Sequence, residues 1–419
     1  MLIFPRLAPG KRREYAGRMG LDVIVIGGGP AGMVAALLLA RAGVRVTVLE
    51  KHADFFRDFR GDTVHPSTME ILHELGLLAR FLRRPHNRID RAEVSWNGRL
   101  MTIGDLTHLA RPAPYIAMMP QWEFLDFLRD EAISLPGFAL RMEAPVESLI
   151  EEGGRITGVR LRSEEELHAR LVLACDGRDS IARTVLPLER LGAPIDVFWL
   201  AVPKTGSGTA LRGSVSGNRL IVMIDRGNYW QCAFVIAKGG AEAIKARGIA
   251  AFRADVQAAA PDLADLASAL PDWSGVSLLS VSLDRLTEWS RPGLLAIGDA
   301  AHAMSPVGGI GINLAVQDAV AAANLLAAPL ARGADVDPLL PYLQKRRLWP
   351  TKIIQRAQRL VHESLLQPVL AGAGDLPEHP PLPMRLLDRY PPLRRIPGWF
   401  IGHGVRQEHV RSPEASRTA

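Results

Sequence analysis

Apolar positions near the start of the chain follow the periods of a strand, a helix and a second strand. Residues 22–26 form a short apolar run of strand length, and residues 30–41 form a run of helix length with Pro30 in its first turn, where a missing N–H costs nothing. Residues 44–49 predict the next strand. Two strands joined by a helix within about thirty residues predict a βαβ unit.

The following segments are also of mixed α/β character. Residues 67–78 predict a helix capped by Ser67, with Glu70 three residues later as the second member of a capping box. Residues 121–134 predict an amphipathic helix. Two further strands, expected to form a hairpin-like addition, are predicted at 158–162 and 167–174.

From residue 195 to residue 238 the pattern changes to strands with tight turns. Residues 219–225 and 229–237 flank Arg226-Gly227-Asn228, which is typical of an antiparallel hairpin. The rest of the chain predicts helices at 241–270, strands at 276–283 and 293–297, a helix at 317–326, and a helical, proline-interrupted region after 335. This order predicts an α/β fold in which a Rossmann-like domain, assembled from separated segments, carries an inserted antiparallel β-sheet and C-terminal helices.

The composition supports a folded protein with two closely packed domains. The chain has 419 residues, of which 48% are hydrophobic, and it has no apolar run of the roughly 18 residues that a membrane span needs. It has two cysteines, Cys175 and Cys232, and both lie in apolar, strand-like runs. A disulfide framework is therefore not expected, the cytoplasm is the expected compartment, and the sequence predicts no metal site.

The net charge of +6 is concentrated at the two ends of the chain. Residues 1–20 carry +4 and residues 341–419 carry +7, so the 320 residues between them carry −5. No nucleic-acid-binding motif accompanies this charge, and we expect no nucleic-acid partner. Residues 1–20 are expected to be a flexible extension.

A glycine-rich motif between the first strand and the first helix indicates a dinucleotide site. Gly27, Gly29 and Gly32 have the G-x-G-x-x-G spacing, in which the three glycines allow a tight turn, a close approach of the backbone to a pyrophosphate, and close helix–strand packing. The helix N-terminus supplies N–H donors for phosphate. Glu50 ends the second strand, where a carboxylate can accept hydrogen bonds from ribose hydroxyls. An incidental glycine-rich turn is the alternative, and the motif alone does not distinguish FAD from NAD.

Two more motifs follow apolar strands later in the chain. One is Asp176-Gly177-Arg178, after the strand that ends at Ala174. The other is Gly298-Asp299, followed by a glycine-rich loop and the start of a helix at about Ile312. Asp299 at a strand end can accept hydrogen bonds from ribityl hydroxyls, and the glycines can bring backbone amides close to a flat ring.

Together, in this order, the three motifs resemble those of the class A flavoprotein monooxygenases, which have the 4-hydroxybenzoate hydroxylase fold. The resemblance covers roughly residues 21–330. It implies FAD, reduction by NADPH or NADH without a separate domain for that cofactor, and a C4a-hydroperoxyflavin intermediate. One departure is Ile310, where relatives often have glutamine.

The resemblance also implies site residues. Those expected to bind the cofactor are Gly27, Gly29, Ala31, Gly32, Glu50, Lys51, Arg60, Gln121, Asp176, Asp299, Gly311, Ile312 and Asn313. Those expected near the substrate are Trp230 and Pro306, with Trp199, Met223 and Tyr229 as weaker candidates because the sequence does not fix which way their strands face. His65 and His302 lie beside the motifs, and we expect structural roles for both, so no catalytic residue is assigned.

The expected domain division follows from the motif positions. Residues 21–90, 121–185 and 285–335 are expected to form the discontinuous FAD-binding domain, residues 91–120 and 186–284 the substrate-binding domain, and residues 336–419 a C-terminal helical region. The expected activity is NAD(P)H- and O2-dependent hydroxylation or epoxidation of an aromatic, quinoid or polycyclic small molecule.

Three alternatives remain open: a flavin-dependent halogenase, a reductase of the same fold, and a non-catalytic flavin-bound binding protein. The absence of a Trp-x-Trp-x-Ile-Pro sequence disfavours a halogenase of the tryptophan type.

The basic C-terminal region raises one further possibility. Apolar residues there stand beside arginines, and this pattern allows at most a weak peripheral contact with an anionic membrane. The residues are Leu393, Ile396, Trp399, Phe400 and Ile401, beside Arg394, Arg395 and Arg406. Because prolines interrupt the segment, packing of these residues under the catalytic domain is the stronger expectation.

Overall fold

The computed structural model describes residues 21–56, 63–204, 211–263, 265–371 and 379–415. The predicted N-terminal extension 1–20 and the predicted cofactor residue Arg60 lie outside these ranges.

A mostly parallel sheet forms the centre of the first domain, as predicted. Its strand order is β19-β20-β11-β1-β2-β8. Strand β1 pairs in parallel with both β2 and β11, so the βαβ unit around α1 is confirmed. Strand β10 pairs antiparallel with β11, which confirms the hairpin predicted for 158–162 and 167–174, and β9, which was not predicted, pairs with β10 at the outer side. The elements are β1 (Leu21–Ile26), α1 (Pro30–Arg41), β2 (Val46–Leu49), β8 (Phe138–Arg141), β9 (Val146–Glu152), β10 (Arg155–Leu161), β11 (Glu166–Ala174), β19 (Ser290–Arg291) and β20 (Leu294–Ala296).

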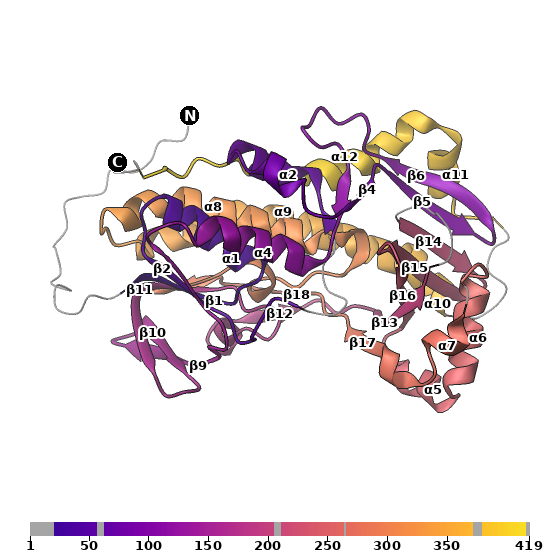
Figure 1. Ribbon diagram of the computed structural model, residues 1–419, viewed down its shortest axis with the longest axis horizontal. Coiled ribbons are helices and arrows are strands. Elements are labelled where there is room, and N and C mark those ends of the chain that lie inside the picture. The colour runs from indigo at the N-terminus through magenta and orange to yellow at the C-terminus, as the bar shows by residue number, and fades with distance from the viewer. Residues whose placement is uncertain (1–20, 57–62, 205–210, 264, 372–378, 416–419) are drawn as a thin grey trace.

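Helices α1, α4 (Gln121–Ala132), α8 (Gly311–Ala331) and α9 (Leu340–Val361) form a layer over this sheet (Figure 1). Their apolar residues share one core with Val23 and Val25 of β1 and Leu171 and Leu173 of β11. The helical stretch Val307–Ala331 is long and apolar enough to cross a membrane by composition, but 72% of its apolar window is buried inside the protein. It therefore has the burial expected of a core helix.

The second domain is built on a seven-stranded sheet with the order β17-β13-β16-β15-β14-β5-β6. Alternate residues of its strands face opposite sides. Phe198 and Phe234 face α6, where each packs edge-on against Phe252 at 5.4 Å between ring centroids. The strands are β5 (Arg91–Trp96), β6 (Arg99–Asp105), β13 (Ile195–Pro203), β14 (Leu211–Ser216), β15 (Arg219–Asp225), β16 (Tyr229–Ala237) and β17 (Val276–Ser280), and the helices on that face are α5 (Ala241–Ala246), α6 (Ile249–Ala259) and α7 (Leu266–Ala269).

The described part of the chain also contains two small sheets. One has the order β3 (Thr63–Val64), β7 (Ile116–Met118), β4 (Asn87–Ile89), in which β7 is central, and the other pairs β12 (Leu188–Arg190) with β18 (Asp284–Leu286).

The predicted helix at 67–78 is wrong in its boundaries and in its cap. Helix α2 (Pro66–Glu74) begins one residue earlier because Pro66 can occupy the first helical position, and His65 is the N-cap. Ser67 lies inside the first turn, and Glu70 pairs with Arg111 at 3.0 Å instead of closing a capping box. Gly76, with φ of +70°, separates α2 from the short helix α3 (Leu78–Phe81).

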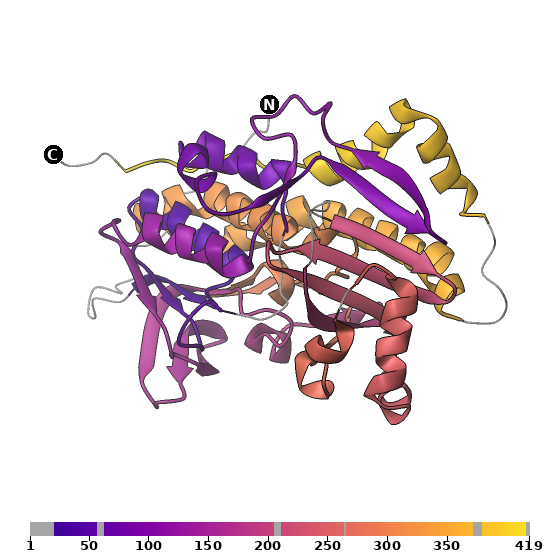
Figure 2. The same ribbon diagram turned by 45° about the vertical axis from the view of Figure 1, so that its right-hand side comes forward.

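After α9 the chain crosses to the antiparallel sheet and then returns. The π-helical turn η6 (His362–Leu366) and α10 (Gln367–Leu370) lead toward the second domain, and α11 (Leu382–Arg389), η7 (Pro391–Arg394) and α12 (Arg395–His403) lie along β5 and β6 (Figure 2). Residues 404–415 then run back to the first domain. There the Val410 N–H donates to Glu74 (2.7 Å) and the Ala415 N–H donates to the Arg41 carbonyl (2.8 Å).

Candidate functional site

The three glycines of the first motif have three different surroundings. Gly27 has φ of +95°, and a Cβ there would lie 2.6 Å from the Cys175 carbonyl oxygen. A Cβ on Gly32 would overlap the Gly27 carbonyl oxygen. A Cβ on Gly29 would meet nothing within 4 Å. Gly27 and Gly32 are therefore required for packing, whereas Gly29 borders open space at the N-terminus of α1, where a pyrophosphate can approach the backbone.

Glu50 is held in place at the end of β2. Its two carboxylate oxygens accept from the Gly28 N–H (2.9 Å) and the His52 N–H (3.1 Å), and its side chain is largely buried. Lys51, next in the chain, is exposed. A cavity of about 250 Å³ lies beside this corner, with Phe55, Phe56 and Trp122 among its lining residues. A Cβ on Gly28 would lie 2.9 Å from Cε1 of Phe55, so this aromatic cavity adjoins the first motif.

Asp176 follows β11 and lies against the first motif. Its Oδ2 accepts from the Ile181 N–H at 2.9 Å, while its Oδ1 is buried with no hydrogen-bond partner among the described residues. Burial raises the pKa of this carboxyl above its usual range, because it outweighs the hydrogen bonds from Ser180 and from the Ile181 N–H, which lower that pKa. The unpartnered oxygen leaves one acceptor available to a ligand.

The third motif is connected to both of the others. Asp299 Oδ2 lies 3.4 Å from Nε of Arg178, and the Asp299 carbonyl accepts from Nη2 of Arg183 at 2.7 Å. A Cβ on Gly298 would lie 3.0 Å from Cβ of Ala31, in the first turn of α1. The three motifs therefore meet at the carboxyl ends of β1, β11 and β20, which is where open α/β sheets bind ligands.

A buried ionic network lies behind the third motif. Asp318 of α8 accepts from the Gly298 N–H (3.2 Å), from Nε2 of His302 (2.6 Å) and from Nε of Arg347 (2.8 Å). Burial alone would raise the pKa of Asp318, but His302 and Arg347 outweigh it and hold that pKa below its usual range. Glu408 continues the network, since its Oε1 lies 3.4 Å from Nη1 of Arg347 and both its oxygens accept from Nε of Arg346 (2.8 and 2.9 Å).

Sequence reasoning missed all of this network except His302. Asp318 and Arg347 lie within helical patterns without a recognisable motif, and Glu408 lies 61 positions beyond Arg347. No signal in the single sequence connects these residues.

The glycine-rich loop after Pro306 is fixed from two sides. Its Gly309 carbonyl accepts from the Thr63 hydroxyl at 2.8 Å. Asn313 Oδ1 accepts from the His65 N–H (3.0 Å) and the Thr68 hydroxyl (2.7 Å), so the Asn313 side chain joins α8 to the N-terminal turn of α2. A Cβ on Gly311 would meet nothing within 4 Å, so the start of α8, which includes Gly311 and the half-buried Ile312, borders open space.

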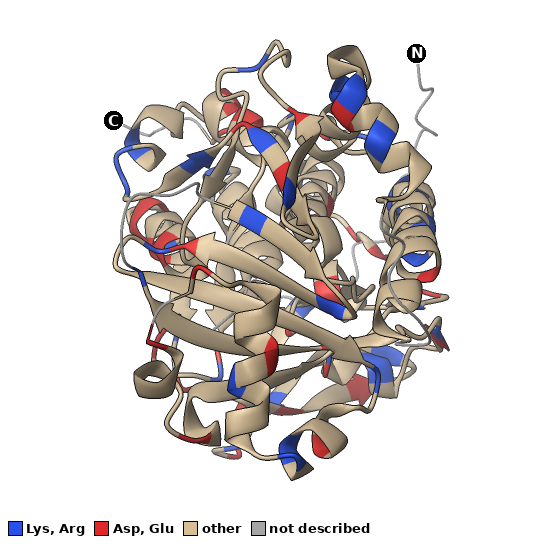
Figure 3. Cartoon of the chain, turned by 90° about the vertical axis from the view of Figure 1, so that its right-hand side faces the viewer, with Lys and Arg blue, Asp and Glu red and all other residues tan. Residues whose placement is uncertain are grey.

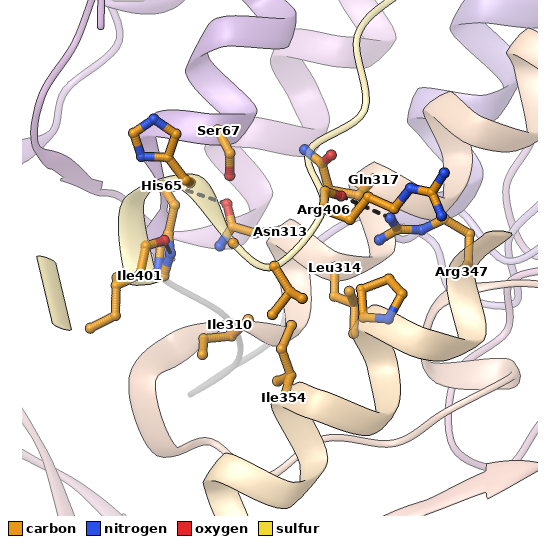
Figure 4. Close-up of a pocket in the computed structure, with 14 residues that line it drawn as sticks. His65, Ser67, Ile310, Asn313, Leu314, Gln317, Arg347, Ile354, Ile401 and Arg406 are labelled. Atoms are coloured by element: carbon orange, nitrogen blue, oxygen red, sulfur yellow. Dashed lines mark hydrogen bonds between the residues drawn. The ribbon is translucent and has the colours of Figure 1, made fainter. Parts of the chain in front are cut away.

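A cavity of about 20 Å³ lies behind this loop, between α2, α8, α9 and α12. Figure 4 shows His65 and Ile401 on one side of it and Gln317 and Arg347 on the other. His65 is buried, with Nδ1 3.1 Å from the Ile401 carbonyl, and burial lowers its pKa to about 4. It is therefore neutral near pH 7. The cavity has room for about one water molecule, so it is too small for a substrate.

The antiparallel sheet faces the glycine loop with an apolar surface. Trp199, Val222 and Val307 contact one hydrophobic cluster, in which Trp199 pairs with Ala233 across the strands. Trp230 lies on the opposite face, where it packs with the cluster that α6 completes and its ring lies 5.0 Å from Nζ of Lys204. The structure therefore brings Trp199, and not Trp230, to the side of the loop that contains Pro306. Met223 also faces the helices.

Gln121 is the first residue of α4 and is half-buried. Its neighbour Trp122 reaches the aromatic cavity beside the first motif, where its ring lies 4.9 Å from that of Phe56. Among the residues that the structure describes, no group of His, Cys, Asp or Glu is arranged to hold a metal ion.

The parallel sheet, the glycine-rich turn and the converging acidic residues are typical of a dinucleotide-binding protein. The sequence model of the family described as "FAD binding domain" matches residues 20–357, and the chain belongs to this family. The open space at Gly29 and Gly311 and the unpartnered Asp176 oxygen fit an FAD molecule.

Characterised relatives agree with this assignment. The chain is 32% identical to a 6-methylpretetramide 4-monooxygenase of Streptomyces rimosus over 96% of its own length and 97% of the relative's. It is 29% identical to a 12-dehydrotetracycline 5-monooxygenase/anhydrotetracycline 6-monooxygenase of Streptomyces rimosus subsp. rimosus, over 78% of this chain and 67% of that one. These similarities identify an FAD-dependent monooxygenase.

A solved structure supports the fold. The p-nitrophenol 4-monooxygenase PnpA of Pseudomonas putida DLL-E4 superposes with a TM-score of 0.73 at 22% identity, covering 92% of this chain and 99% of that one. The predicted fold class is thereby confirmed, and the predicted family is confirmed by the family model and the relatives.

Proposed function

We propose that this protein hydroxylates a polycyclic aromatic small molecule, with NADPH or NADH as reductant and O2 as the source of the oxygen atom. The observation that carries the proposal is the apolar sheet face formed by Trp199 and Val222 opposite the glycine loop. A flat, largely apolar substrate fits between such a face and a flavin ring. The similarity to the 6-methylpretetramide 4-monooxygenase of Streptomyces rimosus, which this chain matches over 97% of that protein's length, supports the same substrate class.

The proposed roles of the residues follow from their surroundings. The backbone around Gly29 and Ala31, at the N-terminus of α1, receives the FAD pyrophosphate, and Glu50 and Lys51 receive the adenosine ribose. The aromatic cavity beside Phe55 and Trp122 suits the adenine ring.

The flavin end is assigned to the later motifs. Asp299 accepts from the ribityl chain, and the first turn of α8, from Gly311 to Asn313, approaches the flavin ring. Asp176 offers its unpartnered oxygen, and Gln121 and Arg60 are proposed to lie on the flavin side as well. Bound FAD supplies the redox chemistry that activates O2. The chain itself holds the substrate against Trp199 and keeps water away from that apolar surface.

The decisive experiment measures NAD(P)H consumption, O2 consumption and product mass together across a panel of polycyclic phenols. Labelled dioxygen should leave one labelled oxygen atom in the product, and incorporation only from labelled water would refute the proposal. Trp199→Ala should raise the substrate KM and increase the share of NAD(P)H consumed without product. Trp230→Ala is the matched control, because that ring lies on the other face of the sheet.

The same panel separates the alternatives. A halogenase gives a halogenated product only when halide is added, and a reductase consumes NAD(P)H with an organic acceptor and without oxygen insertion. A flavin-bound binding protein consumes no NAD(P)H with or without ligand.

A further inference from the structure

The C-terminal helices carry an exposed apolar surface on the outside of the antiparallel sheet. Of the fourteen large apolar side chains that are exposed in the described part of the chain, six lie between residues 382 and 399. We call these six residues the α11–α12 surface: Leu382, Leu386, Tyr390, Leu393, Ile396 and Trp399. Their exposed fractions range from 36% at Leu393 to 67% at Ile396. In Figures 1 and 2, α11 lies at the outer edge of the molecule, with no element beyond it.

Helical spacing places these side chains in stripes that face away from the protein. Leu382 and Leu386 are four positions apart on α11, and Ile396 and Trp399 are three positions apart on α12, so each pair shares a helix face. The inner sides are closely packed. Met384 is buried, and a Cβ on Gly398 would overlap the Asp105 backbone of β6. The small glycine lets α12 rest directly on β6, and the next residue, Trp399, is half exposed to solvent.

The same segment is cationic. Arg385, Arg389 and Arg395 are exposed beside the apolar stripes. The one acidic residue between 379 and 403 is Asp388, and its carboxylate is paired with Arg99 at 3.2 Å. Figure 3 views this end of the molecule and shows the blue basic positions of α11 at the upper right.

We propose that the α11–α12 surface is a peripheral docking site for an anionic lipid bilayer. Leucine, isoleucine and tryptophan side chains insert at the boundary between headgroups and acyl chains, while arginines on the same element pair with anionic headgroups. A second copy of the chain fits the surface less well. A two-fold contact would bring the three arginines of each copy toward those of the other, with Asp388 already paired.

The test is co-sedimentation of the full-length, flavin-loaded protein with vesicles at low salt. Vesicles of phosphatidylcholine with phosphatidylglycerol should pellet the protein, and vesicles of phosphatidylcholine alone should pellet much less. Raising the salt to about 0.15 M or above should weaken binding, because the screening length then falls to about 8 Å. The double variant Ile396→Asp/Trp399→Asp and the triple variant Arg385→Gln/Arg389→Gln/Arg395→Gln should each lower the vesicle-bound fraction about tenfold or more.

Ile133→Asp is the matched control, since Ile133 is 68% exposed at the end of α4, outside the α11–α12 surface, and this variant should bind like the parent. Flavin absorbance and the thermal unfolding midpoint should be unchanged in every variant, because all the altered side chains are exposed. The proposal is overturned if the parent stays in the supernatant with anionic vesicles at low salt, or if the double and triple variants pellet like the parent. It is also overturned if gel filtration without lipid shows a dimer that Ile396→Asp dissociates, since the occupant is then a second copy.

Discussion

Gly29 should be dispensable for folding and indispensable for binding FAD. In the structure it has φ of −74° and ψ of −178°, which alanine adopts freely, and a Cβ there meets no protein atom within 4 Å. Gly29→Ala should therefore leave the free energy of unfolding of the apoprotein unchanged or raise it by up to about 1 kcal/mol, because alanine restricts the unfolded chain. With FAD placed as proposed above, the added methyl group would project into the space of the pyrophosphate.

The loss of flavin affinity can be worked out from the contacts that the methyl group blocks. Hydrogen bonds from N–H groups to a charged acceptor contribute about 1.5–3 kcal/mol each. If the methyl group displaces the pyrophosphate from two N–H donors at the start of α1, about 3–6 kcal/mol is lost. The Kd for FAD should then rise by a factor of roughly 10² to 10⁴.

Gly32→Ala is the comparison that separates packing from ligand binding. Its Cβ would overlap the Gly27 carbonyl and lie 3.1 Å from Cγ1 of Val25, so helix and strand must move apart at a cost of about 1–3 kcal/mol. Urea unfolding of the two apoproteins and FAD titration followed by flavin fluorescence measure both quantities. If Gly29→Ala binds FAD as tightly as the parent protein, the pyrophosphate does not lie at this turn and the reasoning is refuted.

Two further predictions concern buried charge. Glu408→Ala should lower the free energy of unfolding by about 3 kcal/mol or more, because the fully buried Arg347 then loses one of its two carboxylate partners. Glu414→Ala is the control, because Glu414 forms an exposed ion pair with Arg41. In the same urea experiment it should change the free energy of unfolding by less than about 1 kcal/mol. The pKa of His65 is about 4 in the folded protein, below its ordinary value of 6.5, so on acidification the unfolded chain binds this proton before the folded protein does. The free energy of unfolding should therefore fall by up to about 3 kcal/mol as the pH drops from 6.5 to 4. His65→Gln should flatten that part of the stability–pH curve, and an unchanged slope would show that another group is responsible.

The sequence predicted the local elements that have strong periodic patterns. The βαβ unit, the hairpin of β15 and β16, and helix α1 all have apolar patterns that a single period explains. The helix predicted at 67–78 failed because two signals competed. Ser67 and Glu70 match a capping box, but Pro66 fits the first helical turn, and Glu70 finds a tertiary partner in Arg111.

The sequence could not predict, for a different reason, on which face of β16 the Trp230 side chain lies. Both faces of β16 are apolar, with Cys232 and Phe234 toward α6 and Ala233 and Val235 toward the loop. A period-2 pattern fixes the face of a strand only when one side is polar. The choice between Trp199 and Trp230 therefore depends on how the sheet packs, which the single sequence does not contain.

The C-terminal segment at 404–411 interacts with the third motif through buried charged side chains. The motifs that identify the family end before residue 331, and the family model ends at residue 357. Yet a chain of interactions leads from the third motif to the C-terminal segment. The Gly298 N–H donates to Asp318, and Asp318 forms an ion pair with Arg347. Arg347 also pairs with Glu408, and all three charged side chains are fully or almost fully buried. Removing either partner of a buried ion pair between a carboxylate and an arginine is strongly destabilising, because it leaves the other charge buried without a partner. The returning segment at 404–411 is therefore packed against the parallel-sheet half of the protein, although it follows the helices of the α11–α12 surface in the sequence.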